Sequence, residues 1–258
     1  MIVIKDKDEI DIMNRTGQAL ADLFVAIDPK IRPGISTLEL DQLIEQELEK
    51  RNLVSQAKGY MGYKHASCIS LNDEVVHGIP STKRILKEGD LVKIDICAKR
   101  DGYCADMTRM FFVGQPSPEV AKFMQVARMA LDKGINQARP GNYLSDISAT
   151  IQQEVEKHGY GVVRDFAGHG IGRTMHEDPE ILNFGKKGKG PLLRPGMTFA
   201  LEPMITMGHY DVYVADDGWT VRTRDKSLAA HVEDTIAITE GEPCVLTRIK
   251  NYNEGVQN

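Results

Sequence analysis

The stretch that decides the fold is Leu91–Gly114, LVKIDICAKRDGYCADMTRMFFVG. Its Asp101-Gly102 dipeptide is typical of the two-residue turn of a tight β-hairpin, where both residues take positive φ. With that dipeptide at the tip, Asp95 lies opposite Thr108, and Asp106 lies two positions nearer the tip on the second strand. Side chains alternate between faces, so the two aspartates share one face as diagonal neighbours about 7–8 Å apart. A cation could lie between them.

The two faces of this hairpin differ in polarity. One face carries a run of apolar side chains suited to a core, namely Val92, Ile94, Ile96 and Ala98. The other face also carries Lys93 and Lys99, so taken alone the aspartates could belong to a solvated surface. On this register we place Cys97 and Cys104 on opposite faces, and no cysteine forms a CxxC pair, which predicts neither a zinc cage nor a disulfide framework.

An internal repeat favours the interpretation that Asp95 and Asp106 bind an ion. Arg32-Pro33-Gly34 recurs 107 positions later as Arg139-Pro140-Gly141, and the helical pattern after each copy is similar. At the same offset Asp95 becomes Glu202, and after a slip of 20 residues Asp106 becomes Glu233. We therefore expect one domain, 1–258, of two pseudo-symmetric halves, approximately 5–114 and 118–241. Four acids would then meet near the axis, where buried charges need partners.

Composition sets the class of protein. The chain has 258 residues, 41% hydrophobic and 27% charged, which is ordinary for a soluble globular protein. A net charge of −5 argues against a nucleic-acid surface. We find neither a signal-peptide pattern nor a membrane-length apolar run, so we expect a cytoplasmic protein without membrane contact.

The order of predicted elements indicates an α+β fold, with helices covering one face of a curved antiparallel sheet. We expect helices over 5–27, after a Ser36-x-x-Glu39 capping box, from Ser117-Pro118, and over 144–157. We expect one strand over 197–206 carrying Glu202, a hairpin within 209–226, and one long strand over 229–239 carrying Glu233.

The candidate ligands are four carboxylates, at Asp95, Asp106, Glu202 and Glu233, and one histidine. Oxygen donors with one imidazole suit Mn, Fe, Co or Zn, and two divalent ions would balance four negative charges. Paired ions of this kind promote hydrolysis of an amide or ester. Spacing does not decide between the histidines of the Gly-rich loop, His169 and His176, and His77-Gly-Ile echoes the first of them. The remaining histidines have no comparable context: His65, His158, His209 and His231.

Five blocks of the chain together resemble the signature blocks of the type I methionine aminopeptidases. They are NDEVVHGIP (72–80), KIDICAKRDGYCADMTRMF (93–111), GHGIGRTMHEDP (168–179), FALEPM (199–204) and AHVEDTIAIT (230–239). The resemblance implies the pita-bread fold, which has an internal pseudo-two-fold axis. It also implies five metal ligands, with His169 on one ion, Asp95 on the other, Asp106 and Glu233 bridging, and Glu202 completing the set.

The same resemblance implies roles around the metals. His77 would lie near the scissile amide nitrogen, His176 on its carbonyl oxygen, and Glu202 would move protons. A pocket for methionine would be walled by Tyr60, Tyr63, Cys68, Met175 and Trp219, which by themselves read as ordinary core residues. The substrate would be the initiator methionine of new chains whose second residue is small. We expect a monomer, with the ribosome exit region as a further candidate partner.

Three features depart from the family pattern, and two other functions remain open. Met175 stands where phenylalanine is expected, Asp234 stands where histidine is common, and the insertion from His209 to Trp219 has its own sequence. A proline-specific peptidase would share the fold and ligands but normally carries an additional N-terminal domain. A non-catalytic binding module would be expected to lose ligands, and all five are present. The short segment between His176 and Glu202 favours type I, because type II members carry a long insertion there.

Overall fold

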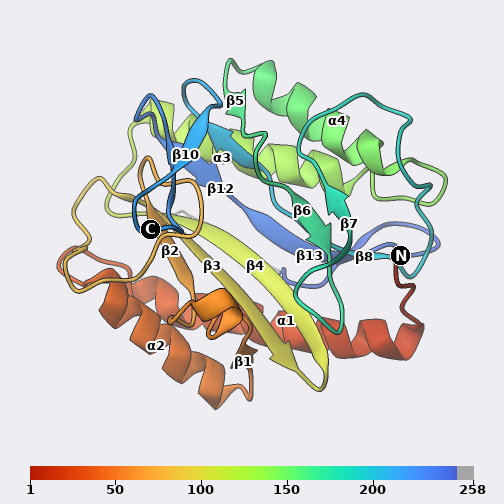
Figure 1. Cartoon of the computed structure of the whole chain (residues 1–258), viewed down its shortest axis with the longest axis horizontal. Coiled ribbons are helices and arrows are strands. Elements are labelled where there is room, and N and C mark those ends of the chain that lie inside the picture. The colour runs from red at the N-terminus through yellow and green to blue at the C-terminus, as the bar shows by residue number, and fades with distance from the viewer. Residues whose placement is uncertain (249–258) are drawn as a thin grey trace.

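The computed structural model describes residues 1–248, and its centre is one curved sheet of nine strands (Figure 1). The spatial order is β1-β3-β4-β13-β8-β6-β7, with β2 beside β3 and β14 beside β13, and every pairing is antiparallel. The strands are β1 Val54–Ser55, β2 Cys68–Leu71, β3 Leu91–Arg100, β4 Tyr103–Phe112, β6 Gly168–Gly170, β7 Glu177–Ile181, β8 Thr198–Leu201, β13 Glu233–Ala237 and β14 Cys244–Val245. Two smaller sheets hold β5 Gly161–Val162, β9 Met204–Thr206 and β12 Ala229–His231, and the hairpin β10 Val212–Val214 with β11 Val221–Thr223.

The β3–β4 hairpin has the predicted register. Asp101 and Gly102 form its tip with φ of 52° and 86°, as a mirror-image turn requires. Asp95 pairs with Thr108 and Cys97 with Asp106, so the two aspartates are diagonal neighbours on one face, as expected. The hairpin predicted within 209–226 is also confirmed, as β10 and β11.

Helices cover one face of the sheet, as predicted. They are α1 Lys7–Ile27, α2 Thr37–Lys50, α3 Pro118–Ile135 and α4 Leu144–Glu156, with short 3₁₀ turns η1 Asp28–Lys30 and η2 Tyr60–Gly62. The capping box predicted at Ser36 and Glu39 is present. In Figure 1, α1 and α2 lie against β3 and β4, whereas α3 and α4 cover the second half of the sheet. No helix within residues 1–248 has the length and apolarity that a membrane span requires.

The core side of the hairpin is the one predicted. Val92, Ile94, Ile96 and Ala98 are fully buried against α1 and α2. The second half repeats this arrangement, because Phe199 of β8 packs with α3 and α4. The four α-helices therefore leave the opposite face of the sheet uncovered, and that face carries the alternating acidic side chains.

Two predicted strands are each divided, and that prediction was wrong. The segment 197–206 forms β8 and β9 in different sheets, with Glu202 between them. Pro203 explains the break, because proline has no N–H to donate to a ladder. The segment 229–239 likewise leaves β12 at Val232 and enters β13 at Glu233.

The placement of the two hairpin cysteines was also wrong. Cys104 pairs with Lys99, and Cys97 pairs with Asp106. Paired residues of an antiparallel ladder share a face, so both cysteines lie on the face that carries Asp95. The predicted register was right, but the face on which each cysteine lies was assigned wrongly.

Candidate metal centre

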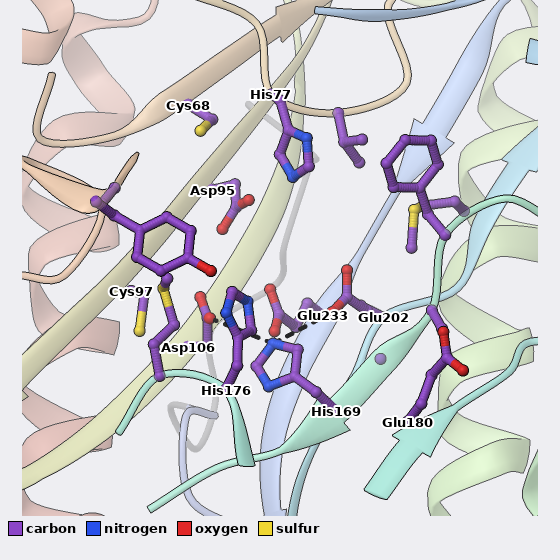
Figure 2. A pocket seen from close by; sticks show the side chains of 18 of the residues that line it. Cys68, His77, Asp95, Cys97, Asp106, His169, His176, Glu180, Glu202 and Glu233 are labelled. Carbon is purple, nitrogen blue, oxygen red and sulfur yellow. Dashed lines mark ion pairs between the residues drawn. The ribbon is translucent and has the colours of Figure 1, made fainter. Parts of the chain in front are cut away.

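All five predicted ligands line one cavity of about 810 Å³ on the face of the sheet that the four α-helices leave uncovered (Figure 2). Asp95 comes from β3, Asp106 from β4, Glu233 from β13, His169 from β6, and Glu202 follows the last residue of β8. These five strands are consecutive neighbours in the sheet. The antiparallel ladder therefore brings together groups that lie far apart along the chain, from Asp95 to Glu233.

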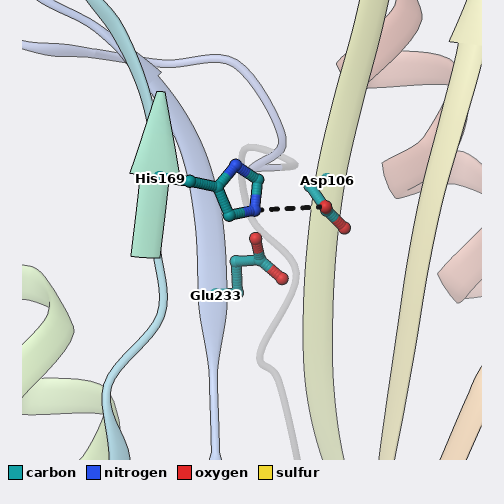
Figure 3. Close-up of side chains that lie close together, drawn as sticks. All are labelled: Asp106, His169 and Glu233. Carbon is teal, nitrogen blue, oxygen red and sulfur yellow. Dashed lines mark ion pairs between the residues drawn. The ribbon is translucent and has the colours of Figure 1, made fainter. Parts of the chain in front are cut away.

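Three of these groups form a compact cluster. One side-chain atom from each of Asp106, His169 and Glu233 lies within 4.8 Å of the others (Figure 3). His169 Nε2 is 3.8 Å from Asp106 Oδ2 and 3.5 Å from Glu202 Oε1. His169 Nδ1 lies 2.9 Å from the Gly170 carbonyl oxygen, to which it donates as the N–H tautomer. That tautomer leaves the Nε2 lone pair directed at the carboxylates, as a metal ligand requires.

Within residues 1–248, no lysine or arginine forms an ion pair with the four carboxylates proposed as ligands. Burial, together with the charge of Asp106, raises the pKa of Asp95 well above its usual value. Burial and mutual repulsion likewise raise the pKa of Glu202 and Glu233, and burial raises that of Asp106 to about 7. Glu233 Oε2 accepts a 2.9 Å hydrogen bond from Thr108, but its buried Oε1 has no hydrogen-bond partner in residues 1–248. Several carboxylates and one neutral imidazole are a ligand set that suits divalent first-row metals, and Glu233 Oε1 is free to bind one.

The two predicted substrate-side histidines flank this cluster (Figure 2). His176 lies edge-on to His169, with ring centroids 4.5 Å apart. His77 has a positive φ of 59° and faces Phe166 across 5.7 Å. Burial lowers the pKa of His77 to about 4 and also lowers that of His176, so both rings are neutral at pH 7. A neutral imidazole can donate one hydrogen bond and accept another.

The five residues predicted to hold methionine line the same cavity. Tyr63 and Trp219 lie together with ring centroids 5.0 Å apart, so the tip of the β10–β11 hairpin does reach the site. Tyr60 lies 5.5 Å from the His176 ring and is partly exposed, at the open side. Cys68 and Met175 complete the set. The sequence reasoning gave no role to Phe166 and Met204, which also line the cavity.

A further residue that the sequence reasoning missed is His231 of β12. The residue is 1% exposed, and its Nε2 lies 3.3 Å from Glu202 Oε2 without a hydrogen bond between them. Burial lowers its pKa to about 3, so the ring is neutral beside the acid. Its place two residues before Glu233 was the only available signal. The prediction of one continuous strand over 229–239 gave no reason for the His231 side chain to approach Glu202.

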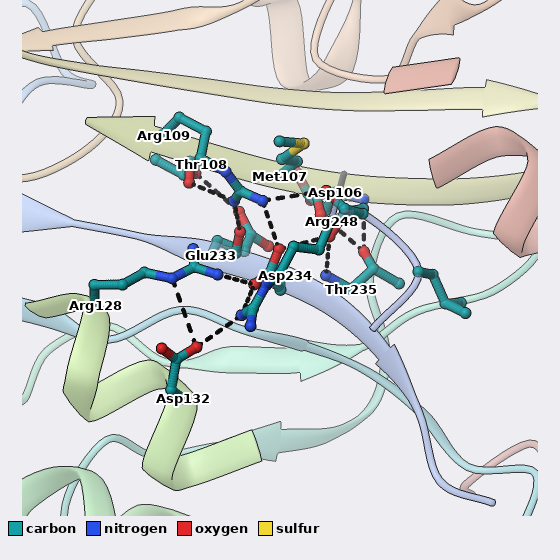
Figure 4. A network of polar contacts seen from close by, with 12 residues as sticks. Asp106, Met107, Thr108, Arg109, Arg128, Asp132, Glu233, Asp234, Thr235 and Arg248 are labelled. Atoms are coloured by element: carbon teal, nitrogen blue, oxygen red, sulfur yellow. Dashed lines mark hydrogen bonds and ion pairs between the residues drawn. The ribbon is translucent and has the colours of Figure 1, made fainter. Parts of the chain in front are cut away.

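Asp234, one residue after Glu233, anchors a separate ion cluster on the opposite side of β13 (Figure 4). Its carboxylate receives Arg109 Nη2 at 2.7 Å, Arg128 Nη2 at 3.0 Å and Arg248 Nη2 at 2.5 Å. Arg109 Nη1 also donates to the Glu233 backbone oxygen at 2.5 Å. Burial alone would raise the pKa of Asp234, but the three guanidinium groups hold it well below its usual range. Asp234, which stands where histidine is common in the family, is therefore neutralised by three arginines.

Comparison with known proteins agrees with this geometry. The pattern of metallopeptidase family M24 matches residues 11–240. The methionine aminopeptidase of Clostridium acetobutylicum is 45% identical over 96% of this chain and 99% of its own. Methionine aminopeptidase 1 of Bacillus subtilis is 44% identical over 96% and 100%.

Solved structures give the same result. Methionine aminopeptidase from Rickettsia prowazekii superposes with a TM-score of 0.94 at 40% identity, covering 96% of this chain and all of that one. A prolidase from Pyrococcus furiosus superposes at 0.78 with 24% identity, over 96% of this chain and 66% of its own, so it shares the fold. These neighbours confirm the expected α+β pita-bread architecture. The chain belongs to metallopeptidase family M24, among its methionine aminopeptidases.

Proposed function

We propose that this protein removes the N-terminal initiator methionine from new polypeptides whose second residue is small, by hydrolysing the first peptide bond. One observation carries the proposal. Five consecutive strands present four carboxylates and one imidazole to a single cavity with an apolar wall. Such a site combines a place for cations with a place for an uncharged side chain.

The site would hold two divalent ions, of Co, Mn, Fe or Zn. In this proposal His169 and Glu202 would hold one ion, Asp95 would hold the other, and Asp106 and Glu233 would serve both. The positions of the ligands support two ions. Asp106, His169 and Glu233 form one compact group, whereas Asp95 is on β3, one strand further along the sheet than Asp106. When bound, such ions acidify water and polarise a carbonyl oxygen.

Three side chains would then manage the substrate. Glu202 lies off the ladder at the end of β8, with Oε1 toward His169 and Oε2 toward His231, so it can accept and return a proton. His176, neutral, would donate to the carbonyl oxygen of the scissile bond. His77, also neutral, would contact the amide nitrogen that leaves. All three border the same cavity.

The specificity would come from the apolar wall. Tyr60, Tyr63, Cys68, Met175 and Trp219 would surround the methionine side chain. Aromatic edges and polarizable sulfur both favour a thioether. Met175, in the place of phenylalanine, keeps that surface apolar but more deformable.

The wider context follows the same proposal. We infer a single catalytic domain, 1–258, with an internal repeat of approximately 5–114 and 118–241. We also infer a cytoplasmic monomer that acts on emerging N-termini, with the ribosome exit region as a candidate partner. A proline-specific peptidase is the second candidate, because prolidases share the fold.

The experiment is metal-reconstituted turnover of three peptides. Purified protein is stripped with chelator, reloaded with Mn²⁺, and given Met-Ala-Ser, Leu-Ala-Ser and the dipeptide Ala-Pro. The proposal expects release of methionine far faster than of leucine, and no cleavage of Ala-Pro. Preferred cleavage of Ala-Pro would establish the second candidate instead. Equal rates for Met and Leu would refute the specificity.

A further inference from the structure

The hairpin β10–β11 leads Trp219 to the cavity, but it forms a small sheet of its own and has to be held against the rest of the protein. Its neighbour is the segment 73–76, which runs directly into His77. Three backbone hydrogen bonds of 2.7 to 3.1 Å join this segment to β11, the shortest from Val75 N–H to Val221 O. One junction therefore connects a wall of the methionine pocket with a histidine on the substrate side.

Glu74 is the centre of the side-chain contacts at this junction. It is 3% exposed, and both of its carboxylate oxygens accept hydrogen bonds. Oε1 accepts one of 2.6 Å from Arg222 Nη2 on β11, and Oε2 accepts one of 2.7 Å from Leu71 N–H and another from Arg84 Nη2. Arg222 Nη1 also donates to both oxygens of Asp73, at 3.1 and 3.0 Å. Two acids and two arginines thus form a charge-balanced group, which we call the Glu74 cluster.

The Glu74 cluster holds the chain on both sides of His77. Glu74 precedes His77 by three residues, and Arg84 Nη1 donates at 2.7 Å to the carbonyl oxygen of Ile79, two residues after it. His77 itself has a φ of 59°, which a residue with a side chain adopts only when its surroundings impose it. The cluster supplies such surroundings, because it fixes the backbone before and after this residue.

We propose that Glu74 is a positioning residue, which fixes the separation of His77 and Trp219 through Arg84 and Arg222. The two rings lie edge to face, with centroids 6.4 Å apart. In the proposed function Trp219 contacts the methionine side chain and His77 contacts the amide nitrogen of the bond to be cleaved. The positioning depends on the contacts alone, whereas its effect on turnover rests on the proposed function.

The two arginines should divide the effect between binding and chemistry. Arg222 holds the hairpin, so its loss should displace Trp219 and mainly raise KM. Arg84 holds the segment after His77, so its loss should mainly lower kcat. Glu74 joins both arginines, so its loss should change both constants. A displacement of about 1 Å at a reacting centre can cost about 10²-fold in rate, and we expect a fall of about this size in kcat/KM for Glu74→Gln.

The first test compares Glu74→Gln, Arg222→Met and Arg84→Met in the full chain without metal. Glu154→Gln is the matched control, because the Glu154 side chain is also 4% exposed and paired with two basic side chains, but it lies on α4. Trp219 is the only tryptophan in the sequence, so its emission reports on the hairpin. The emission should shift to the red, and acrylamide should quench it more, in the first two variants only.

The second test follows His77 by NMR of protein labelled with ¹³C-histidine, in which the His77→Asn spectrum assigns the ring signal. That signal should move in Glu74→Gln and in Arg84→Met, since the ring currents of Trp219 depend on its distance. The same proteins, loaded with Mn²⁺, are then assayed on Met-Ala-Ser for kcat and KM separately. A purely structural role would change stability but would not divide the two constants between the arginine variants.

The outcomes separate this proposal from the proposed function. Changes in emission and in the His77 signal that Glu154→Gln does not share support the positioning role, even if Met-Ala-Ser proves not to be the substrate. A parent-like emission or His77 signal in Glu74→Gln overturns it, and so do equal changes in Glu154→Gln. If Glu74→Gln does not fold, Arg222→Met decides, because the Arg222 side chain is 35% exposed and its loss is tolerated more easily. Parent-like emission in that variant also overturns the proposal.

Discussion

Replacing Asp234 by asparagine should destabilise the protein strongly, although the change is nearly isosteric. The Asp234 side chain is fully buried and neutralises Arg109, whose side chain is only 3% exposed. The other two guanidinium groups, of Arg128 and Arg248, are partly exposed and can recover some hydration. Removing one partner of a buried ion pair costs about 3–5 kcal/mol, mostly because a buried charge is left uncompensated. For a domain of this size that corresponds to a fall in Tm of roughly 6–20 °C.

The measurement is urea unfolding at 25 °C with chelator present, so that metal binding does not contribute. Glu242→Gln is the matched control. It removes a carboxylate that also pairs with an arginine, but that pair is 40% and 74% exposed. Exposed pairs are worth about 0–1 kcal/mol, so the control should unfold close to the parent. A double-mutant cycle with Arg128→Met should give a coupling of about 0.5–3 kcal/mol.

The same substitution should reach the metal site through the backbone. Arg109 holds both Asp234 and the carbonyl oxygen of Glu233. Asp234→Asn should therefore also weaken Mn²⁺ binding, by about 10–100-fold. If the variant unfolds within about 1 kcal/mol of the parent, like Glu242→Gln, the ion cluster does not hold this segment and the reasoning fails.

Four further predictions test the site itself. Asp106→Asn should bind fewer Mn²⁺ ions per chain, measured by elemental analysis, and should lose turnover. Full turnover would exclude a bridging role for Asp106. His176→Ala should keep its metal content and lose about 10²–10⁴-fold in kcat, and loss of metal instead would make it a ligand. Met175→Phe should change the free energy of methionine binding by less than about 1.5 kcal/mol, measured through KM. Because the pKa of Asp106 is raised to about 7, Mn²⁺ binding should release protons and tighten between pH 6 and pH 8, and calorimetry in buffers of different ionisation enthalpy would detect this.

Local rules were enough to predict the first half of the site. The turn residues Asp101-Gly102 set the register, and alternation then placed Asp95 and Asp106 together. The repeat extended this logic to Glu202 and Glu233, and the resemblance selected His169 over His176, which spacing alone could not do. Periodicity and caps predicted the helices because their apolar stripes face one continuous sheet.

The sequence reasoning failed where the chain passes between sheets. Both 197–206 and 229–239 contain enough apolar residues for one long strand, and only the tertiary pairing divides them. Register within a ladder is a local property, whereas the change from β12 to β13 depends on which strands are already present. His231 was missed for this reason, since its approach to Glu202 exists only because β12 pairs with β9 rather than continuing β13.

Glu233 and Asp234 show how the chain distinguishes a metal ligand from a structural acid. They are adjacent on β13, so their side chains leave opposite faces of the sheet. On the helix side, α3 and neighbouring segments supply arginines to Asp234, and its pKa falls. On the cavity side, no lysine or arginine of residues 1–248 lines the wall beside Glu233, and its pKa rises. A buried acid left without protein cations is stable as a carboxylate only when a cation arrives from solution, so the metal requirement follows from where the arginines were placed.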